Sequence, residues 1–217
     1  MYKKIILIVG IVFLCLNLVN AQPIKSKVES YHESWNYGFL LSGAYNGVTK
    51  AENAQYKFGY KAGFIAEKRL IYFLYFQPCL SFVNRSFSYT RPFEGKLDVN
   101  AYIIEGVANI ALKFGDHIKN RGLIIYISPY ISYGIGGKTI IDSLSKNNEI
   151  VINGQIEEKT FSDKMLNAFD IGFFLGLGYD INEHWGLSLG YIAGMQRIMN
   201  YSGNRWKGFQ FQINYFL

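Results

Sequence analysis

The feature that most constrains the fold is a series of eight segments in which apolar and polar side chains alternate, all of them after the first 35 residues. A period of two is typical of β-strands and not of helices. A sheet can cross a lipid bilayer only if it closes on itself and leaves no backbone edge unpaired. Eight strands make the smallest closed transmembrane barrel. The sequence therefore predicts an all-β fold, an eight-stranded antiparallel up-and-down transmembrane β-barrel, with strands at residues 36–46, 56–67, 71–89, 99–114, 123–136, 167–180, 185–194 and 208–217.

The two faces of each predicted strand differ in polarity, most clearly in the sixth segment. There Phe169, Phe173 and Leu177 alternate with residues such as Asp170 and Gly176. We expect the apolar face to contact lipid, because glycine and serine suit a narrow interior and aromatic residues near strand ends suit a membrane interface. The reverse assignment would describe a soluble barrel with an apolar cavity, such as a lipocalin-like carrier. A charged fraction of only 18% also favours a membrane protein over a soluble one.

Long and short connections alternate along the chain. Outer-membrane barrels place short turns on the periplasmic side and long loops outside, so both termini are expected in the periplasm. Within the third long connection, residues 150–156 are predicted to form a hairpin that extends above the membrane. The predicted long connections are 47–55, 86–98, 137–166 and 195–207, and the shorter ones are 68–70, 115–122 and 181–184.

The N-terminus predicts export. Lys3 and Lys4 precede an almost unbroken apolar stretch at residues 5–19, and Ala21 provides a small residue at the expected cleavage site. This layout is that of a secretory signal peptide, and the apolar stretch is shorter than the ~20 residues of a spanning helix. We therefore expect a signal peptide at 1–21, a periplasmic segment at 22–35 and the barrel at 36–217. Cleavage leaves Cys79 as the sole cysteine, which excludes an intrachain disulfide.

The alternation also places charged residues inside the predicted barrel. A buried charge is costly unless it is paired, so we expect a network of ion pairs and hydrogen bonds in the lumen. The alternative is a path for ions or protons, which would make the protein a small channel or transporter. Eight strands enclose an interior just wide enough for side chains to fill, which favours the filled lumen. The predicted network consists of Lys61, Glu67, Gln77, Arg85, Glu105, Lys113, Asp170, Gln210 and Gln212.

Catalytic and cofactor chemistry find little support in the sequence. A lipid hydrolase on the barrel wall needs a histidine within reach of its nucleophile, but His32, His117 and His184 are expected before the first strand or in turns. The histidines and cysteines do not have the spacing of metal ligands, and no cofactor is expected. Lysines and arginines do not cluster into a stripe, which argues against nucleic acid as a partner.

The outer strand ends combine aromatic and arginine residues, among them Tyr89, Arg91, Arg205 and Trp206. This composition suits the recognition of proteins or sugars, and it also suits anchoring against an anionic lipopolysaccharide leaflet, which electrostatics favours. The expected partners are therefore the outer-membrane lipid bilayer and lipopolysaccharide, with secretion or envelope proteins as further candidates.

Several segments resemble the outer-membrane β-barrel domain family that is common in Bacteroidetes and includes PorT-like proteins. The resemblance is carried by residues 74–82, by 169–173 with 176–179, and by 209–217, and it covers essentially the whole mature chain. It implies an eight-stranded barrel, and some members of the family are connected with protein secretion. We therefore expect a non-enzymatic outer-membrane protein with a structural or protein-interaction role, with PorT-like assistance to secretion as one version and a small channel or transporter as the alternative.

Overall fold

The structure is a computed structural model. The chain forms two compact units, Met1–Glu33 and Ser34–Leu217. The structure describes residues 35–49, 54–91, 95–116, 121–142, 155–162, 165–199 and 203–217. The predicted signal peptide and, apart from Trp35, the predicted periplasmic segment lie outside the described residues. The fold described below is therefore that of the second unit.

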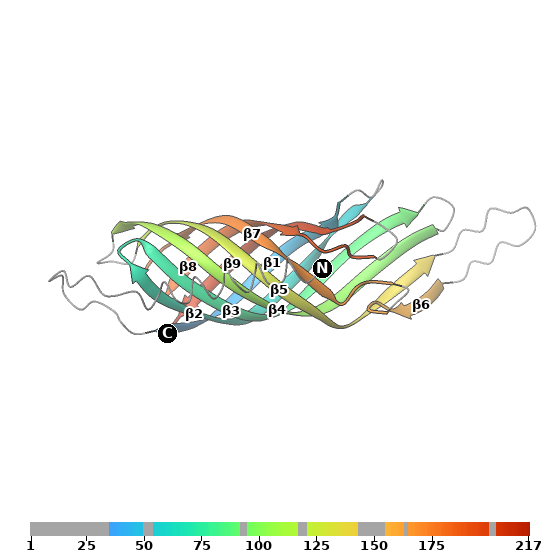
Figure 1. Cartoon of the computed structure of the whole chain (residues 1–217), viewed down its shortest axis with the longest axis horizontal. Coiled ribbons are helices and arrows are strands. Elements are labelled where there is room, and N and C mark those ends of the chain that lie inside the picture. The colour runs from blue at the N-terminus through green and yellow to red at the C-terminus, as the bar shows by residue number, and fades with distance from the viewer. Residues whose placement is uncertain are drawn as a thin grey trace, which may run out of the picture. The chain divides into compact units, whose positions relative to one another are not determined.

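The second unit is a closed ring of antiparallel strands (Figure 1). β1 pairs with both β2 and β9, and β4 pairs with β5, so eight of the nine strands form the ring and β6 extends it beside the end of β5. The predicted eight-stranded antiparallel barrel is confirmed. Its strands are β1 (Asn36–Val48), β2 (Gln55–Ile71), β3 (Leu74–Arg91), β4 (Gly95–Asp116), β5 (Arg121–Asp142), β6 (Gln155–Lys159), β7 (Phe169–Asp180), β8 (Trp185–Gly194) and β9 (Trp206–Phe216).

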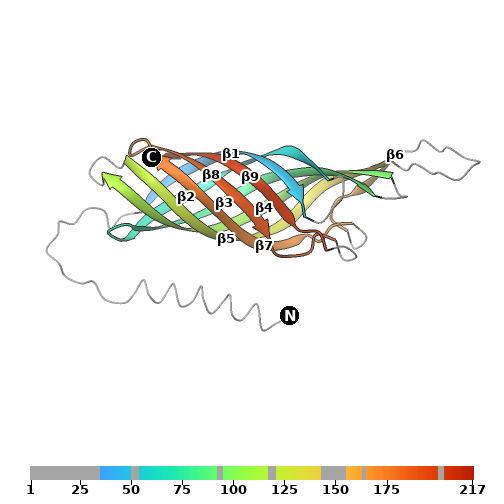
Figure 2. The same cartoon turned by 90° about the horizontal axis from the view of Figure 1, so that it is seen from above.

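The barrel has two different ends, and Figure 2 shows the strands running obliquely between them. At the turn end, β2 connects to β3, β4 to β5 and β7 to β8; at the loop end, β1 connects to β2, β3 to β4, β5 through β6 to β7, and β8 to β9. Because the number of strands in the ring is even, β1 begins and β9 finishes at the same end, which is the turn end.

The outer surface of the ring is apolar, as the alternation predicts. On β1, the side chains of Phe39 and Leu41 are 47% and 64% exposed, whereas that of Leu40 between them is 1% exposed. β7 repeats the pattern, with Phe173 exposed and Phe174 buried. Each strand of the ring pairs with a neighbour on both sides, so an apolar outer surface can face hydrocarbon over the paired part of the wall.

Aromatic side chains gather on the outer surface near both ends of the barrel. Towards the loop end, Tyr45 stacks on Tyr56 with ring centroids 5.4 Å apart, and Phe82 stacks on Tyr102 at 5.7 Å. Towards the turn end, the rings of Trp185 and Tyr215 lie 4.8 Å apart. Aromatic girdles of this kind mark the two interfaces of a membrane around a transmembrane barrel.

Two of the predicted long connections, 86–98 and 137–166, are wrong in their bounds, because strands continue into them. β3 and β4 remain paired as far as Arg91 and Gly95, within the predicted loop 86–98. The reason is a change in which face is apolar. Up to Phe82 most apolar residues of β3 point outwards, Tyr75 and Cys79 excepted, but Phe87 and, on β4, Val99 point inwards and are fully buried. This switch interrupts the outward apolar alternation, so the sequence pattern imitates the end of a strand.

The remaining differences concern boundaries. The turn between β2 and β3 lies at Tyr72 and Phe73, not at the predicted residues 68–70. In the third long connection, β6 pairs with residues 138–142 of β5 and extends the sheet at the loop end. β6 starts at Gln155, and most of the segment 150–156, for which a hairpin was predicted, lies outside the described residues.

Candidate functional site

The nine polar residues predicted for the interior all occupy inward-facing positions. Eight are buried, and the side chain of Lys113 is 13% exposed. They separate into two groups of charged residues and one row of amides. β2 contributes Lys61 and Glu67, β3 contributes Gln77 and Arg85, β4 contributes Glu105 and Lys113, β7 contributes Asp170, and β9 contributes Gln210 and Gln212.

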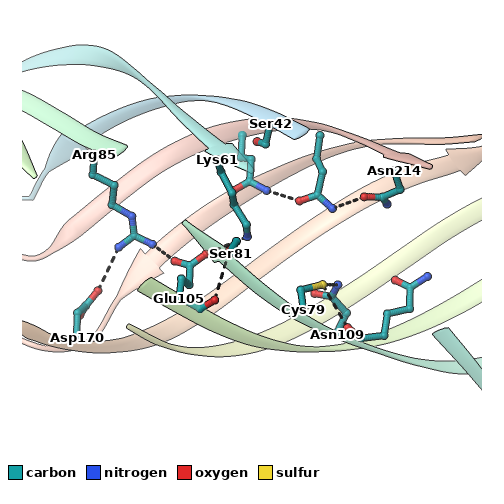
Figure 3. Close-up of polar contacts among 12 residues, drawn as sticks. Ser42, Lys61, Cys79, Ser81, Arg85, Glu105, Asn109, Asp170 and Asn214 are labelled. Atoms are coloured by element: carbon teal, nitrogen blue, oxygen red, sulfur yellow. Dashed lines mark hydrogen bonds and ion pairs between the residues drawn. The ribbon is translucent and has the colours of Figure 1, made fainter. Parts of the chain in front are cut away.

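The first group, called here the Arg85 cluster, comprises Lys61, Arg85, Glu105, Tyr130 and Asp170. Glu105 accepts a hydrogen bond from Lys61 at 2.9 Å through one carboxylate oxygen and is paired with Arg85 through the other (Figure 3). Arg85 Nη1 lies 3.5 Å from Asp170 Oδ2, which also accepts a hydrogen bond of 2.7 Å from the Tyr130 hydroxyl. Two cations thus face two carboxylates, and their formal charges cancel.

The strand register explains how these side chains meet. Glu105 on β4 lies directly opposite Ser81 on β3 and Ser132 on β5, and Ser132 in turn lies opposite Asp170 on β7. The Ser81 hydroxyl donates to the Glu105 carbonyl oxygen at 3.3 Å (Figure 3). Because serine is small, the neighbours of Glu105 leave space in the lumen for the long side chain of Arg85 to reach both carboxylates.

The Arg85 cluster is almost completely withdrawn from solvent. The Arg85 and Glu105 side chains are 1% and 0% exposed. Aromatic rings flank the cations: the Arg85 guanidinium carbon lies 5.2 Å from the Tyr130 ring centre, and Lys61 Nζ lies 4.9 Å from that of Phe174. Cation–π contacts of this kind gain strength when they are desolvated. Burial this deep is tolerable only because each charge has an opposite partner.

Part of the hydrogen-bonding capacity of the Arg85 cluster is unused. Arg85 Nε and Nη1 and Asp170 Oδ1 are buried without a hydrogen-bond partner among the described residues. The pair formed by Arg85 and Asp170 is therefore held by Coulomb attraction at a longer distance, whereas Lys61 and Glu105 form a direct hydrogen bond. Glu105 is thus the residue on which both cations of the cluster depend most closely.

The second group, called here the Lys113 cluster, lies towards the turn end. Lys113 Nζ lies 2.6 Å from Glu67 and 2.7 Å from Asp180, and Gln77 donates a hydrogen bond of 2.5 Å to Glu67. One cation is shared by two carboxylates here. Asp180 was not among the predicted site residues, although it has the same parity as Asp170 on β7, and that parity could have identified it.

A row of amides lines the lumen along β9. Gln210 donates to Gln212, and Gln212 donates to Asn214, each at 2.7 Å (Figure 3). Among the described residues, the two glutamines hydrogen-bond to each other and not to the charged side chains. Asn109 and Cys79 help to line the same part of the lumen, where a cavity of about 20 Å³ offers room for about one water molecule.

An apolar plug fills the loop end of the interior. Its centre is the pair formed by Phe87 and Trp206, whose rings meet edge to face with centroids 5.2 Å apart. Sequence reasoning missed the plug because most of its members fall in segments that were predicted to be loops. The signal was present as inward-facing apolar residues on both sides of Arg85. The plug comprises Val48, Val83, Phe87, Leu97, Val99, Ala101, Ile103, Leu166, Ile198, Met199 and Trp206.

The histidines lie in a turn or outside the described residues. His184 lies in the turn between β7 and β8, as predicted; its ring stacks on Tyr215, and its Nδ1 lies 2.9 Å from the carbonyl oxygen of Phe216. His32 and His117 lie outside the described residues. Within the described ranges, there is no group of three or more residues of the types that could hold a metal ion.

The described part of the chain has no helix that is long and apolar enough to cross a membrane.

Comparison with protein families gives one match of high coverage. Residues 20–200 match the family described as outer membrane protein beta-barrel domain. A comparison with curated protein sequences gives no significant match.

Solved structures of low sequence identity also align with the chain. The attachment invasion locus protein Ail of Yersinia pestis aligns with a TM-score of 0.49 at 9% identity, covering 84% of this chain and 98% of Ail. Neisserial surface protein A, NspA, aligns with a TM-score of 0.48 at 13% identity, covering 85% of this chain and 100% of NspA. A second structure of Ail, in complex with the heparin analogue sucrose octasulfate, aligns with a TM-score of 0.48 at 8% identity, covering 85% of this chain and 99% of that one.

Proposed function

Because the chain belongs to the outer membrane protein beta-barrel domain family, we propose that this integral outer-membrane protein is a non-enzymatic, non-conducting scaffold whose loop end binds another protein of the cell envelope. A signal peptide at 1–21 exports the chain, and both termini face the periplasm. The outer-membrane lipid bilayer and lipopolysaccharide surround the barrel.

The observation that carries the proposal is the filled interior. The apolar plug occupies the loop end, and the Arg85 cluster below it buries its four charges in matched pairs. Conduction needs a continuous file of water, and eight strands enclose little more volume than their own side chains fill. Ion pairs that neutralise each other also offer a passing ion no net charge to bind. These features support a structural use of the interior.

The loop end supports a role in binding. β3 and β4 continue as a hairpin to Arg91 and Gly95, and β6 lengthens the sheet beside the end of β5. Regular strands that project past the aromatic girdle present a rigid surface, and a rigid surface loses less conformational entropy when a partner binds. PorT-like assistance to protein secretion is one version of this function, and it is supported only by the resemblance of the sequence.

A small channel is the second candidate, and the row of charged residues through the lumen is the observation that favours it. Planar-bilayer recordings on the refolded barrel distinguish the two candidates. We expect the wild type to show no stable conductance. Leu189→Ala, on the outer face of β8, should be equally silent and controls for the handling of the protein. A stable, large conductance of the wild type would refute the scaffold and establish the channel.

Photo-cross-linking tests the proposed binding surface. A photoreactive residue at Ile140, an exposed position of β5 beside β6, should capture one discrete envelope protein in cells, and unlabelled barrel should compete with this adduct. The same residue at Leu189, 62% exposed on the outer face of β8, should capture lipid only. If Ile140 and Leu189 gave the same products, the loop end would not be a binding surface.

A further inference from the structure

The ladder between β5 and its neighbours is interrupted near the loop end. β5 pairs with β7 as far as Tyr133 and with β6 from Lys138 onwards. Between these two pairings, two backbone hydrogen bonds join β5 to the described residues that follow β6 and precede β7: Gly134 N–H donates to the Ala168 carbonyl oxygen, and Thr160 N–H donates to that of Gly137. Residues 135 and 136 therefore have no strand partner on this side within the described part of the chain.

The interruption coincides with an irregularity on the opposite side of β5. On β4, Tyr102 lies opposite Gly136 and Ile103 lies opposite Gly134, so Ile135 is an extra residue in the ladder. Such β-bulges bend a strand and are enriched beside functional sites. Gly137 has a φ of 144°, a conformation that other residues rarely adopt. Three of the four residues at positions 134–137 are glycines, and their conformational freedom allows the bulge to form.

A hollow of about 570 Å³ opens at this place. This volume falls within the usual range for small-ligand sites, about 300–1,000 Å³. Phe161 covers Gly134 from one side, whereas a Cβ atom added to Gly136 would meet nothing within 4 Å. Gly136 thus marks the empty part of the hollow, and backbone, aromatic and hydroxyl groups share its lining: Tyr133, Ile135, Gly136, Lys159, Thr160 and Phe161.

The hollow lies at the level of the loop-end aromatic girdle. Tyr133, which lines it, is 60% exposed on the outer surface and lies opposite Phe169 of β7 and Ile104 of β4. Tyr102 of the girdle lies opposite Gly136 itself. Aromatic girdles lie at the depth of lipid headgroups. The molecules most concentrated at the mouth of the hollow are therefore lipids of the adjoining leaflet.

The charge beside the hollow favours an anion. Lys138 and Lys159 lie directly opposite each other in the ladder, and like charges in this position repel. Glu157 pairs with Lys138 at 2.6 Å, and this hydrogen bond raises the pKa of that ammonium group above its ordinary value. No described carboxylate forms an ion pair with Lys159, which lines the hollow. A phosphate placed there would compensate the remaining charge.

We propose that this hollow binds the phosphate-bearing headgroup of an anionic lipid of the outer leaflet, with Lys159 holding the phosphate and the acyl chains following the wall past Tyr133. The proposal rests on the proposed orientation, in which the loop end faces outwards.

The first test compares two lipids that differ only in the headgroup. The full barrel is placed in nanodiscs of phosphatidylglycerol or of phosphatidylcholine with identical acyl chains, and the lipids that remain bound after release are counted by native mass spectrometry. We expect phosphatidylglycerol to be retained about tenfold more strongly than phosphatidylcholine, because one additional charge-assisted contact contributes an effect of about that size. Equal retention of the two lipids would overturn the proposal.

Substitutions test the position of the site. Gly136→Leu should fill the hollow and abolish the preference for phosphatidylglycerol, because its side chain enters open space. Gly106→Leu is the matched control on β4, where an added Cβ meets Ile131 at an ordinary 3.7 Å, and it should retain the preference. Lys159→Gln should weaken retention, and Lys159→Arg should restore it. Unchanged retention in Gly136→Leu would refute this site.

Folding and insertion are measured separately, by the change in gel mobility on boiling. A barrel that is folded, inserted and non-conducting but shows no lipid preference would refute the lipid site and leave the proposed scaffold intact. A conducting barrel that retains phosphatidylglycerol through Gly136 would refute the scaffold and leave the lipid site intact.

Discussion

The two charged clusters of the lumen solve the same problem in different ways. The Arg85 cluster is buried beneath the apolar plug, with exposures of 1% for Arg85 and 0% for Glu105, and its charges balance. The Lys113 cluster lies nearer the turn end, where Lys113, Glu67 and Asp180 are 13%, 9% and 10% exposed, and it has one more carboxylate than cations.

The comparison teaches that the depth of burial governs how strictly charges must match. Transferring an ion from water to a medium of low dielectric constant costs about 20 kcal/mol in the idealised case. After the protein relaxes, the cost is still several kcal/mol per ion, so an unmatched charge in the Arg85 cluster would be strongly destabilising. Near the mouth of the barrel, partial hydration reduces that cost. The Lys113 cluster can therefore keep an excess carboxylate that the deeper cluster cannot.

The largest expected effect is that of Glu105→Gln. The substitution leaves Lys61 and Arg85 deeply buried with Asp170 as their only described carboxylate partner. Removing one partner of a buried ion pair costs about 3–5 kcal/mol. We expect the free energy of unfolding in lipid vesicles, followed by tryptophan fluorescence in guanidinium titrations, to fall by that amount. If Glu105→Gln lowered the free energy of unfolding by less than Lys113→Met does, the relation between burial and charge matching would be contradicted.

A smaller effect is expected for Lys113→Met, which removes the cation from the Lys113 cluster. Glu67 and Asp180 then face each other without a cation, but both side chains are more exposed than those of Arg85 and Glu105. The cost should therefore approach the desolvation penalty of a partly hydrated group, about 1–3 kcal/mol. The same titration measures it. The double variant with Glu105→Gln should be close to additive, because the clusters share no described partner.

The smallest effect is expected for Glu157→Gln, which breaks the pair with Lys138 outside the barrel. Both side chains are more than half exposed, at 56% and 74%. Exposed ion pairs contribute little to stability. We expect no measurable change in the unfolding titration, so this variant serves as the matched glutamate-to-glutamine control for Glu105→Gln. A loss as large as that of Lys113→Met would show that depth does not decide the effect.

Much of the fold was predictable because the membrane imposes a simple rule on each strand. In β5 and β7 every second residue is apolar where the strands contact lipid, as at Ile127 and Leu175, and both strands were predicted there, although β5 continues six residues beyond its predicted end. The rule fails towards the loop end, where Phe87 and Val99 turn their apolar side chains inwards. There the strands leave the bilayer, and the interior, not the lipid, requires apolar groups.

The candidate site was predictable as a set of residues but not as contacts. Parity shows that Lys113 and Glu67 face inwards, but it cannot show that they meet each other while Arg85 meets Glu105. That choice depends on the register between strands that are distant in the sequence. The hollow beside Gly136 was also invisible, because it arises where β5 exchanges one neighbour for another.

The sequence by itself determined that the chain forms a ring of eight strands with one apolar and one polar face, because a period of two in side-chain polarity is a property of each strand separately. Only the tertiary structure decided which charges pair, how the loop end is plugged and where the wall opens. Those features depend on how far each strand is shifted along its neighbours, and closure of the ring fixes all of these shifts together.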